Sequence, residues 1–363
     1  MRAGKTDFQK RLSALRQSLR QRRLDSLLVT SRVNVRYLTG FTGAGSICFV
    51  SKEQAVFVTD FRYLDQARLD VQDFSIVIAA KTLFDGLKQE NVISPSQKIG
   101  FEAAHLRYSH YLALIELFPN TSFEPTENMV ESIAIRKEPD EISYLAEAAN
   151  IADSALARVL PFVKAGKKEF EIAAKLSYRM RCSGAEKDSF DPVVASGWRS
   201  ALPHGMASDK VIDDGDFLVM DFGAVYKGYA SDITRTVAVG KASPNMKMIY
   251  GIVKDAQQKA IDAARAGMTC DALDRVARDY IHQKGFGQYF GHSLGHGLGL
   301  EVHSPPRVGA GSETVLEENF VITIEPGIYI PNVGGVRIED DIVIQKDGAG
   351  LLTHFSRELL EIE

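Results

Sequence analysis

Short apolar runs alternate with amphipathic stretches along the first third of the chain. Four runs, SLLVT, SICFV, AVFVT and SIVIAA, have the length and composition of strands. Helical spacing of apolar positions predicts helices near residues 62–70 and 107–117. Because strands that alternate with helices are typical of α/β domains, we predict a small α/β domain in this part of the chain.

The segment before the first strand is basic, with eight Lys or Arg residues against one Asp in residues 1–23. We predict an amphipathic helix there whose charges face solvent, because its apolar residues lie close to helical spacing: Phe8, Leu12, Leu15 and Leu19. The segment is too polar for a secretion signal, and no run approaches the roughly 18 apolar residues of a membrane helix. We expect a cytosolic protein without a membrane partner.

A charged stretch with two prolines, FEPTENMVESIAIRKEPD, follows the α/β pattern. We place the domain boundary near residue 127, which gives domains 1–127 and 128–363, and we expect Asp140 to cap a long helix. In the second domain, helical patterns lie at about 140–164, 168–183 and 246–284. One strand-rich region lies between the second and third of these, and another follows the third and runs to the C-terminus. Helices and antiparallel strands in separate blocks predict an α+β domain.

The composition of the 363-residue chain is that of an ordinary globular protein. It has 45% hydrophobic residues and a net charge of −4, from 43 Lys and Arg against 47 Asp and Glu. The slight acidity argues against a nucleic-acid partner. Cys48, Cys182 and Cys270 lie far apart without a CxxC pair, so we expect neither a disulfide framework nor a thiolate zinc site.

Two predicted hairpins each carry a pair of carboxylates. In GDFLVMDFGAVYKGYASDITRTVAVG, a turn centred on residues 226–228 places Asp221 opposite Asp232. In NFVITIEPGIYIPNVGGVRIEDDIVI, we expect Glu325 inside an apolar strand, followed by a Pro/Asn/Gly turn, with Glu339 returning after 14 residues. The sequence therefore predicts four acidic side chains presented by two hairpins of one domain.

Such carboxylates would cost several kcal/mol each inside apolar strands unless a positive charge neutralises them. One interpretation is that they lie on exposed strand faces or pair with arginine, as Glu339 would with Arg337. The other is a metal centre, in which two divalent ions would balance the four negative charges. The repetition of the pattern in two hairpins favours the metal centre.

Histidines cluster between the two hairpins, in GHSLGHGLGLEVHSPPR. His292, His296 and His303 are interleaved with glycines that disfavour a helix, so the first two do not form a helical metal-binding pair. Close approach of the backbone to a metal or a substrate is the better interpretation. A carboxylate-rich, thiolate-free ligand set favours Mn²⁺, with Co²⁺, Fe²⁺ or Zn²⁺ as alternatives.

The order of these motifs resembles that of the pita-bread metallopeptidases, in particular the Xaa-Pro branch of prolidase and aminopeptidase P. The resemblance rests on MDFGAVYKGYASDITRT, HSLGHGLGLEVHSPP, TIEPGIY and GGVRIEDD, and it extends to SRVNVRYLTGFTGAG and SFDPVVASGWRSALPHG, so it covers nearly the whole chain. It implies a creatinase-like α/β domain followed by a pita-bread catalytic domain, an α+β fold overall.

The resemblance implies two divalent metal ions per subunit. Asp221 and Asp232 would bind one metal, and Asp232 would bridge to a second metal that also takes His296 and Glu325. Glu339 would bridge both. Glu325 would also act as the proton shuttle that activates the attacking hydroxide and protonates the leaving nitrogen.

Further residues match positions around the family's metals. His204, His292 and His303 would contact substrate and stabilise charge during the reaction. Arg337 would support the carboxylate ligands, and Arg307 would hold the terminal carboxylate of the substrate.

The implied activity is release of the residue that precedes proline, from Xaa-Pro dipeptides or from longer Xaa-Pro peptides, by a homodimer. Phe190, Trp198 and Tyr229 are near the motifs and are candidates for a proline pocket, although aromatic residues in strands are more often core. Two alternatives share the fold: a non-catalytic peptide-binding protein and a methionine-aminopeptidase-like enzyme. The filled ligand positions count against the first, and the N-terminal domain counts against the second.

Overall fold

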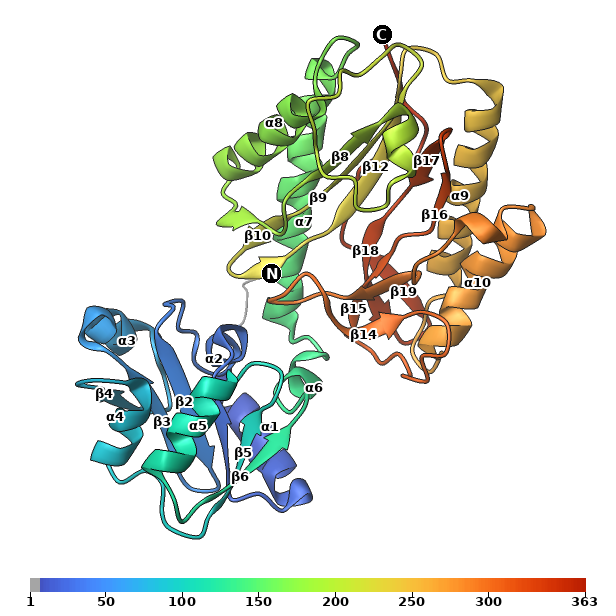
Figure 1. The fold of residues 1–363 in the computed structure, drawn as a ribbon. Coiled ribbons are helices and arrows are strands. Elements are labelled where there is room, and N and C mark those ends of the chain that lie inside the picture. The colour runs from blue at the N-terminus through green and yellow to red at the C-terminus, as the bar shows by residue number, and fades with distance from the viewer. Residues whose placement is uncertain (1–6) are drawn as a thin grey trace. The chain divides into compact units, whose positions relative to one another are not determined.

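The computed structural model, which describes residues 7–363, shows two compact units that divide between Ala134 and Ile135 (Figure 1). This division falls seven residues after the position chosen from the sequence. Helix α6, Glu131–Ala134, belongs to the N-terminal unit because the Glu131 carboxylate accepts a 2.6 Å hydrogen bond from Asn34 of helix α2. The first six residues of the basic segment lie outside the described residues.

The N-terminal unit is built on one six-stranded sheet of order β4-β3-β2-β1-β5-β6. The strand bounds are β1 Ser26–Val29, β2 Ser46–Ser51, β3 Ala55–Thr59, β4 Ser75–Ile78, β5 Lys98–Glu102 and β6 Ser122–Thr126. Strand β2 pairs antiparallel with β1 and β3, whereas the β3–β4, β1–β5 and β5–β6 pairs are parallel. The four strands predicted from the sequence are present, and β5 and β6 complete the sheet.

Helices cover this sheet and confirm the predicted α/β organisation. Their bounds are α1 Phe8–Arg22, α2 Arg32–Thr39, α3 Leu64–Asp70, α4 Leu83–Gln89 and α5 Tyr108–Leu117. Helix α1 buries Leu12, Leu15 and Leu19, which confirms the amphipathic helix. Helices α2 and α4, which the sequence pattern did not indicate, begin with side-chain caps at Ser31 and Thr82.

The C-terminal unit contains strands between two pairs of helices. The helices are α7 Pro139–Val159, α8 Glu169–Cys182, α9 Pro244–Ala263 and α10 Cys270–Gln283. Figure 1 shows α7 and α8 on one flank of the strands and α9 and α10 on the other. Each pair buries its own apolar cluster, so the helices hold the strands from both flanks and confirm the α+β arrangement.

The strands of this unit form several sheets. A four-stranded sheet of order β20-β12-β9-β8 contains the first carboxylate hairpin, and a five-stranded sheet of order β14-β13-β15-β18-β19 contains part of the second. The bounds are β7 Lys187–Asp188, β8 Val193–Ser196, β9 Phe217–Phe222, β10 Ala224–Tyr226, β11 Tyr229–Ala230, β12 Ile233–Val239, β13 Gly295–Gly297, β14 Ser304–Val308, β15 Val321–Ile324, β16 Gly327–Ile330, β17 Gly334–Arg337, β18 Asp340–Gln345, β19 Gly348–Leu351 and β20 Glu361–Ile362.

One helix prediction is wrong, and the structure resolves another in more detail. Helix α7 is capped by Glu138 and not by Asp140, because Pro139 suits the first helical position and the Glu141 carboxylate accepts the backbone N–H of Glu138 at 2.8 Å. The helical pattern over 246–284 is two helices, α9 and α10, and Gly267 between them has a φ of 86°. Within residues 7–363, no helix combines the length and apolar character that crossing a membrane requires.

Candidate active site

The first carboxylate hairpin turns more tightly than predicted. Strand β9 pairs with β12 so that Asp221 lies opposite Thr234, and the expected pairing of Asp221 with Asp232 is wrong. Lys227 and Gly228 alone form the turn, with φ of 50° and 87°, the backbone that two-residue hairpins adopt. Asp232 therefore precedes β12, and both acids still line the same cleft.

The second hairpin brings its two acids together as predicted, but Glu325 follows strand β15 and does not lie inside it. Ile324 of β15 lies opposite Asp340 of β18, and Gly327 of β16 lies opposite Arg337 of β17, so one register runs through both ladders. Glu325 and Glu339 occupy the break between these ladders and therefore face each other. The backbone N–H of Glu339 donates to the carbonyl of Thr234 at 3.1 Å, which ties this hairpin to the first.

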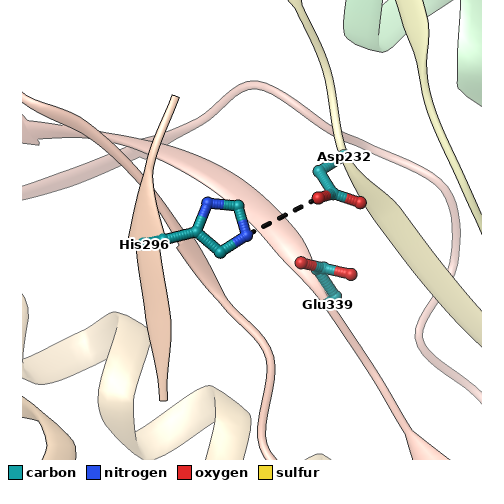
Figure 2. A group of neighbouring side chains, drawn as sticks. All are labelled: Asp232, His296 and Glu339. Atoms are coloured by element: carbon teal, nitrogen blue, oxygen red, sulfur yellow. Dashed lines mark ion pairs between the residues drawn. The ribbon is translucent and has the colours of Figure 1, made fainter. Parts of the chain in front are cut away.

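Asp232, His296 and Glu339 converge although the chain separates them widely (Figure 2). One ligand atom from each lies within 4.8 Å of the other two, so these residues could hold a metal ion. His296 Nε2 lies 3.7 Å from Asp232 Oδ2 and 3.6 Å from Glu325 Oε1. Of the five predicted ligands, four thus lie around one point.

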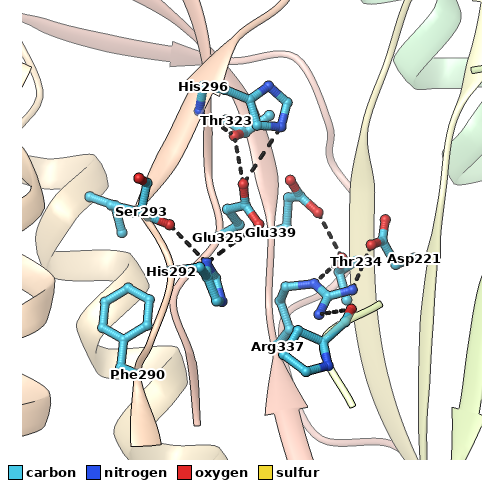
Figure 3. Close-up of polar contacts among 12 residues, drawn as sticks. Asp221, Thr234, Phe290, His292, Ser293, His296, Thr323, Glu325, Arg337 and Glu339 are labelled. Carbon is cyan, nitrogen blue, oxygen red and sulfur yellow. Dashed lines mark hydrogen bonds and ion pairs between the residues drawn. The ribbon is translucent and has the colours of Figure 1, made fainter. Parts of the chain in front are cut away.

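Asp221, the fifth predicted ligand, forms an ion pair with Arg337 (Figure 3). The same guanidinium donates to the Thr234 hydroxyl at 3.0 Å and to the Tyr329 hydroxyl at 2.8 Å. Glu339 instead accepts a hydrogen bond from Thr234 at 2.6 Å. The Asp221 carboxylate is thus held at the cleft by a charge-assisted contact.

The acidic side chains are protected from solvent and lie close to one another. Burial raises the pKa of Asp232 well above its usual range, and the Glu339 carboxylate adds to the effect. Burial also raises the pKa of Glu325 strongly and that of Glu339 to about 8. Asp221 Oδ1 and Asp232 Oδ1 are buried without a hydrogen-bond partner. A divalent cation would satisfy these oxygens and stabilise the charged carboxylates.

The His296 ring has the tautomer that a metal ligand requires. Its Nδ1 lies 3.1 Å from the carbonyl oxygen of Gly297, which can only accept, so Nδ1 carries the proton and Nε2 presents a lone pair to the carboxylates. Burial, followed by the nearby His303, lowers the pKa of His296 to about 4, which keeps the ring neutral. The residues present therefore fit a metal ion.

The other predicted histidines surround the same point. His292 Nδ1 contacts the Ser293 carbonyl at 2.8 Å, so its Nε2 accepts from the Tyr329 hydroxyl at 3.0 Å. Burial lowers the pKa of His292 to about 4. The ring of His303 lies 4.3 Å from that of His296, and exposed His204 lines the opening.

One cleft of about 520 Å³ within the C-terminal unit is lined by the five predicted ligands, by Arg337 and by the three other histidines, His204, His292 and His303. Arg307 also lines it and donates to the Ser293 hydroxyl at 2.9 Å and the Ala310 carbonyl at 2.6 Å. Of the three aromatic candidates, Phe190 lines the cleft. Trp198 and Tyr229 are not among its lining residues, and Tyr229 is a core residue that donates to Glu141 at 2.8 Å.

The structure adds residues that the sequence analysis did not single out. Tyr329 bridges His292 and Arg337, and Thr234 bridges Glu339 and Arg337. Both lie inside the quoted motifs TIEPGIY and DITRT, so a systematic reading of every polar residue in those motifs would have found them. Pro203 and Met206, which also line the cleft, carry no chemical signal in the sequence.

Known proteins resemble both units. The family description "Metallopeptidase family M24" matches residues 143–346, and "Creatinase/Prolidase N-terminal domain" matches residues 11–133. A solved Xaa-Pro dipeptidase from Bacillus anthracis is 45% identical, covers 98% of this chain and 99% of its own, and superposes with a TM-score of 0.95. The Xaa-Pro dipeptidase of Pyrococcus horikoshii is 42% identical over 93% of this chain and 95% of its own.

A third relative carries a different name. A solved X-Pro aminopeptidase from Thermotoga maritima is 39% identical, covers 95% of this chain and all of its own, and superposes with a TM-score of 0.88. The matches follow the order of the two compact units, which confirms the creatinase-like domain, the pita-bread domain and the assignment as a peptidase. The chain belongs to metallopeptidase family M24.

Proposed function

We propose that this chain hydrolyses the peptide bond that precedes proline, with two divalent metal ions held by Asp221, Asp232, His296, Glu325 and Glu339. The observation that supports the proposal is the convergence of four of these side chains at the cleft, with the fifth placed there by Arg337. When bound, such ions lower the pKa of a water molecule and polarise a carbonyl group. The oxygen-rich ligand set favours Mn²⁺ over Co²⁺, Fe²⁺ or Zn²⁺.

Glu325 is suited to carry a proton. Without a bound cation, burial and then the Glu339 carboxylate raise the pKa of Glu325, so the metal-free protein binds a proton there more readily than at an exposed glutamate. His292 lies beside it, with Nδ1 at 4.0 Å from Glu325 Oε2. The nitrogen of proline has no hydrogen in an Xaa-Pro bond and must receive one to leave, and Glu325 delivers it.

The remaining groups of the cleft bind and orient the peptide. His204 and His303 are exposed at the cleft and are placed to contact substrate and stabilise charge on its carbonyl oxygen. His292 is held by Tyr329, which restricts the orientation of its ring. Arg307 offers a guanidinium at the cleft for a terminal carboxylate, which a free dipeptide presents close to the scissile bond.

An activity assay on peptides of two lengths distinguishes a prolidase from an aminopeptidase P. Metal-free protein should be supplied with Mn²⁺ and assayed on an Xaa-Pro dipeptide, an Xaa-Pro-Yaa tripeptide and an Xaa-Ala dipeptide. Cleavage of the Xaa-Pro dipeptide alone indicates a prolidase, and cleavage of the tripeptide indicates an aminopeptidase P. A fully loaded protein that cleaves neither Xaa-Pro substrate contradicts the proposal. We also propose that the protein is a homodimer, and light scattering on the same sample measures its mass in solution.

The variant Asp232→Asn tests the metal assignment in the same assay. We expect loss of activity and of bound metal, because a neutral amide replaces a buried ligand. Asp347→Asn is the control, since Asp347 is an exposed carboxylate in the turn between β18 and β19. Equal metal content in both variants would refute the assignment of Asp232 as a ligand.

A further inference from the structure

One wall of the cleft is a segment with little regular structure, residues 196–208. It contains the short helix η3, Gly197–Ala201, and then a loop from which Pro203, His204 and Met206 line the cleft. A loop that presents an exposed histidine needs contacts elsewhere to keep its position. The two ends of this segment converge on a single buried side chain.

That side chain is Glu169, the first residue of helix α8, which is fully buried. Its Oε1 accepts hydrogen bonds from the backbone N–H and the hydroxyl of Ser196 at 2.7 and 3.0 Å. Its Oε2 accepts from the backbone N–H and the hydroxyl of Ser208 at 3.1 and 2.7 Å, and Arg199 Nε lies 3.4 Å away. The Glu169 carboxylate therefore binds the first residue of the segment, its last residue and Arg199 of the short helix η3.

The middle of the segment is attached to strand β17. The backbone N–H of Gly335 donates to the Ser200 hydroxyl at 2.8 Å, and Arg337 Nη1 donates to the Pro203 carbonyl at 3.2 Å. Arg199 Nη2 donates to the Met206 carbonyl at 2.7 Å and closes the loop on itself. Since Arg337 also holds Asp221, the position of the wall is coupled to that of a proposed metal ligand.

Glu169 does not line the cleft, so it does not take part in the chemistry directly. A fully buried carboxylate is stabilised here by the donors of three segment residues and by the N-terminus of α8. We propose that Glu169 is a positioning residue whose buried carboxylate ties the two ends of segment 196–208 together and thereby holds His204 at the cleft. This role rests on the proposed function of the cleft.

The variant Glu169→Gln tests the inference without relying on activity. Glutamine keeps the size of the side chain but replaces one acceptor by an N–H group that faces the donors of Ser196 or Ser208. Trp198, the only tryptophan of the chain, lies in η3 and reports on the segment by its fluorescence. We expect a shift of its emission maximum and roughly twofold stronger quenching by acrylamide, because a segment without these hydrogen bonds is more mobile and exposes Trp198 to the quencher.

Glu171→Gln is the matched control because Glu171 lies one half-turn further along α8, is partly exposed and accepts hydrogen bonds from Lys167 and Lys168, outside segment 196–208. We expect wild-type Trp198 fluorescence for this variant. Ser208→Ala, which removes one hydroxyl donor to Glu169, should reproduce the Glu169→Gln change to a smaller extent, and it keeps the test valid if Glu169→Gln does not fold. Wild-type fluorescence of Ser208→Ala, or of a folded Glu169→Gln, would overturn the inference.

Activity supplies the second test, once wild type is shown to cleave an Xaa-Pro peptide. We expect Glu169→Gln to lower kcat/KM roughly 10- to 100-fold, with bound metal unchanged. His204→Ala should then cost much less in the Glu169→Gln background than in wild type, because both changes remove the same contact. If the fold-loss of kcat/KM in the double variant equals the product of the losses in the two single variants, Glu169 does not act through His204, and the inference is contradicted. A wild type without activity would refute the proposed function and leave the fluorescence test in force.

Discussion

Buried carboxylates at the cleft hold protons more tightly than exposed ones. Burial, and then the Asp221 charge, raise the pKa of Glu339 from 4.5, the ordinary value of a glutamate, to about 8. Between these values the folded, metal-free protein binds a proton at Glu339 that the unfolded chain has lost. By linkage, its contribution to the free energy of unfolding falls as pH rises through this window.

This gives a prediction for metal removal. A bound cation replaces the proton on Glu339, so the rise in Tm produced by Mn²⁺ should be larger at about pH 7.5 than at about pH 5.5, with each unit of pKa shift worth about 1.4 kcal/mol. Calorimetry of chelator-treated protein, with and without Mn²⁺ at both pH values, measures the effect. A Mn²⁺-induced rise in Tm that is larger at the lower pH would contradict it.

Tyr329 connects His292 to Arg337 and allows a second prediction at the level of single residues. Tyr329→Phe removes the hydroxyl and leaves the His292 Nε2 without that donor, so we expect kcat/KM for an Xaa-Pro peptide to fall about 10-fold or more. The free energy of unfolding should fall by about 1–2 kcal/mol.

Tyr250→Phe is the control for this experiment. The Tyr250 hydroxyl is also part of a hydrogen bond in the same unit, to the Arg357 carbonyl at 3.0 Å, but Tyr250 does not line the cleft. It should lose comparable stability and keep wild-type kcat/KM. Equal losses of activity in the two variants would show that the Tyr329 hydroxyl acts on stability alone.

At the level of elements, the joint between β9 and β10 depends on close approach of two backbones. A Cβ atom on Gly223 would lie 1.8 Å from the carbonyl oxygen of Ser231, the residue before Asp232. Gly223→Ala must therefore displace the short segment between β11 and β12 that carries Asp232. We expect a loss of about 1–3 kcal/mol in the free energy of unfolding together with weaker Mn²⁺ binding by titration calorimetry.

Gly251→Ala provides the comparison, because Gly251 lies in helix α9 and a Cβ there meets nothing within 4 Å. Alanine should stabilise that helix by about 0.5–1 kcal/mol and leave Mn²⁺ binding unchanged. If Gly223→Ala bound Mn²⁺ as tightly as Gly251→Ala, the contact between Gly223 and Ser231 would not determine the position of Asp232.

The elements themselves differ in how far the sequence predicts them. Strongly patterned segments such as β2, β3 and α8 were located closely, because apolar periodicity reflects which face of a segment is buried. The register of the first hairpin was predicted wrongly, since the residues YKG allow a turn of two or three residues. Only the ladder hydrogen bonds of β9 and β12 select the two-residue turn.

At the level of the whole molecule, every proposed metal ligand belongs to one of the two compact units. We therefore predict that calorimetry resolves two transitions, of which Mn²⁺ raises only the one that belongs to residues 135–363. Ile342→Ala, in the core of that unit, should lower the same transition, and Leu28→Ala, in the core of the N-terminal unit, should lower the other. A single transition that all three changes move together would contradict the prediction.

The sequence by itself determined the fold class, the two hairpins, and the identity and order of the residues proposed as metal ligands, because these depend on local periodicity and on motifs that are contiguous in the chain. The tertiary structure decided which ligands meet. It brings Asp232, His296 and Glu339 together, places Asp221 against Arg337, and joins Ser196 and Ser208 at Glu169. Such contacts link residues as far apart as Thr234 and Glu339, and they follow from the packing of one hairpin on another, which no local pattern encodes.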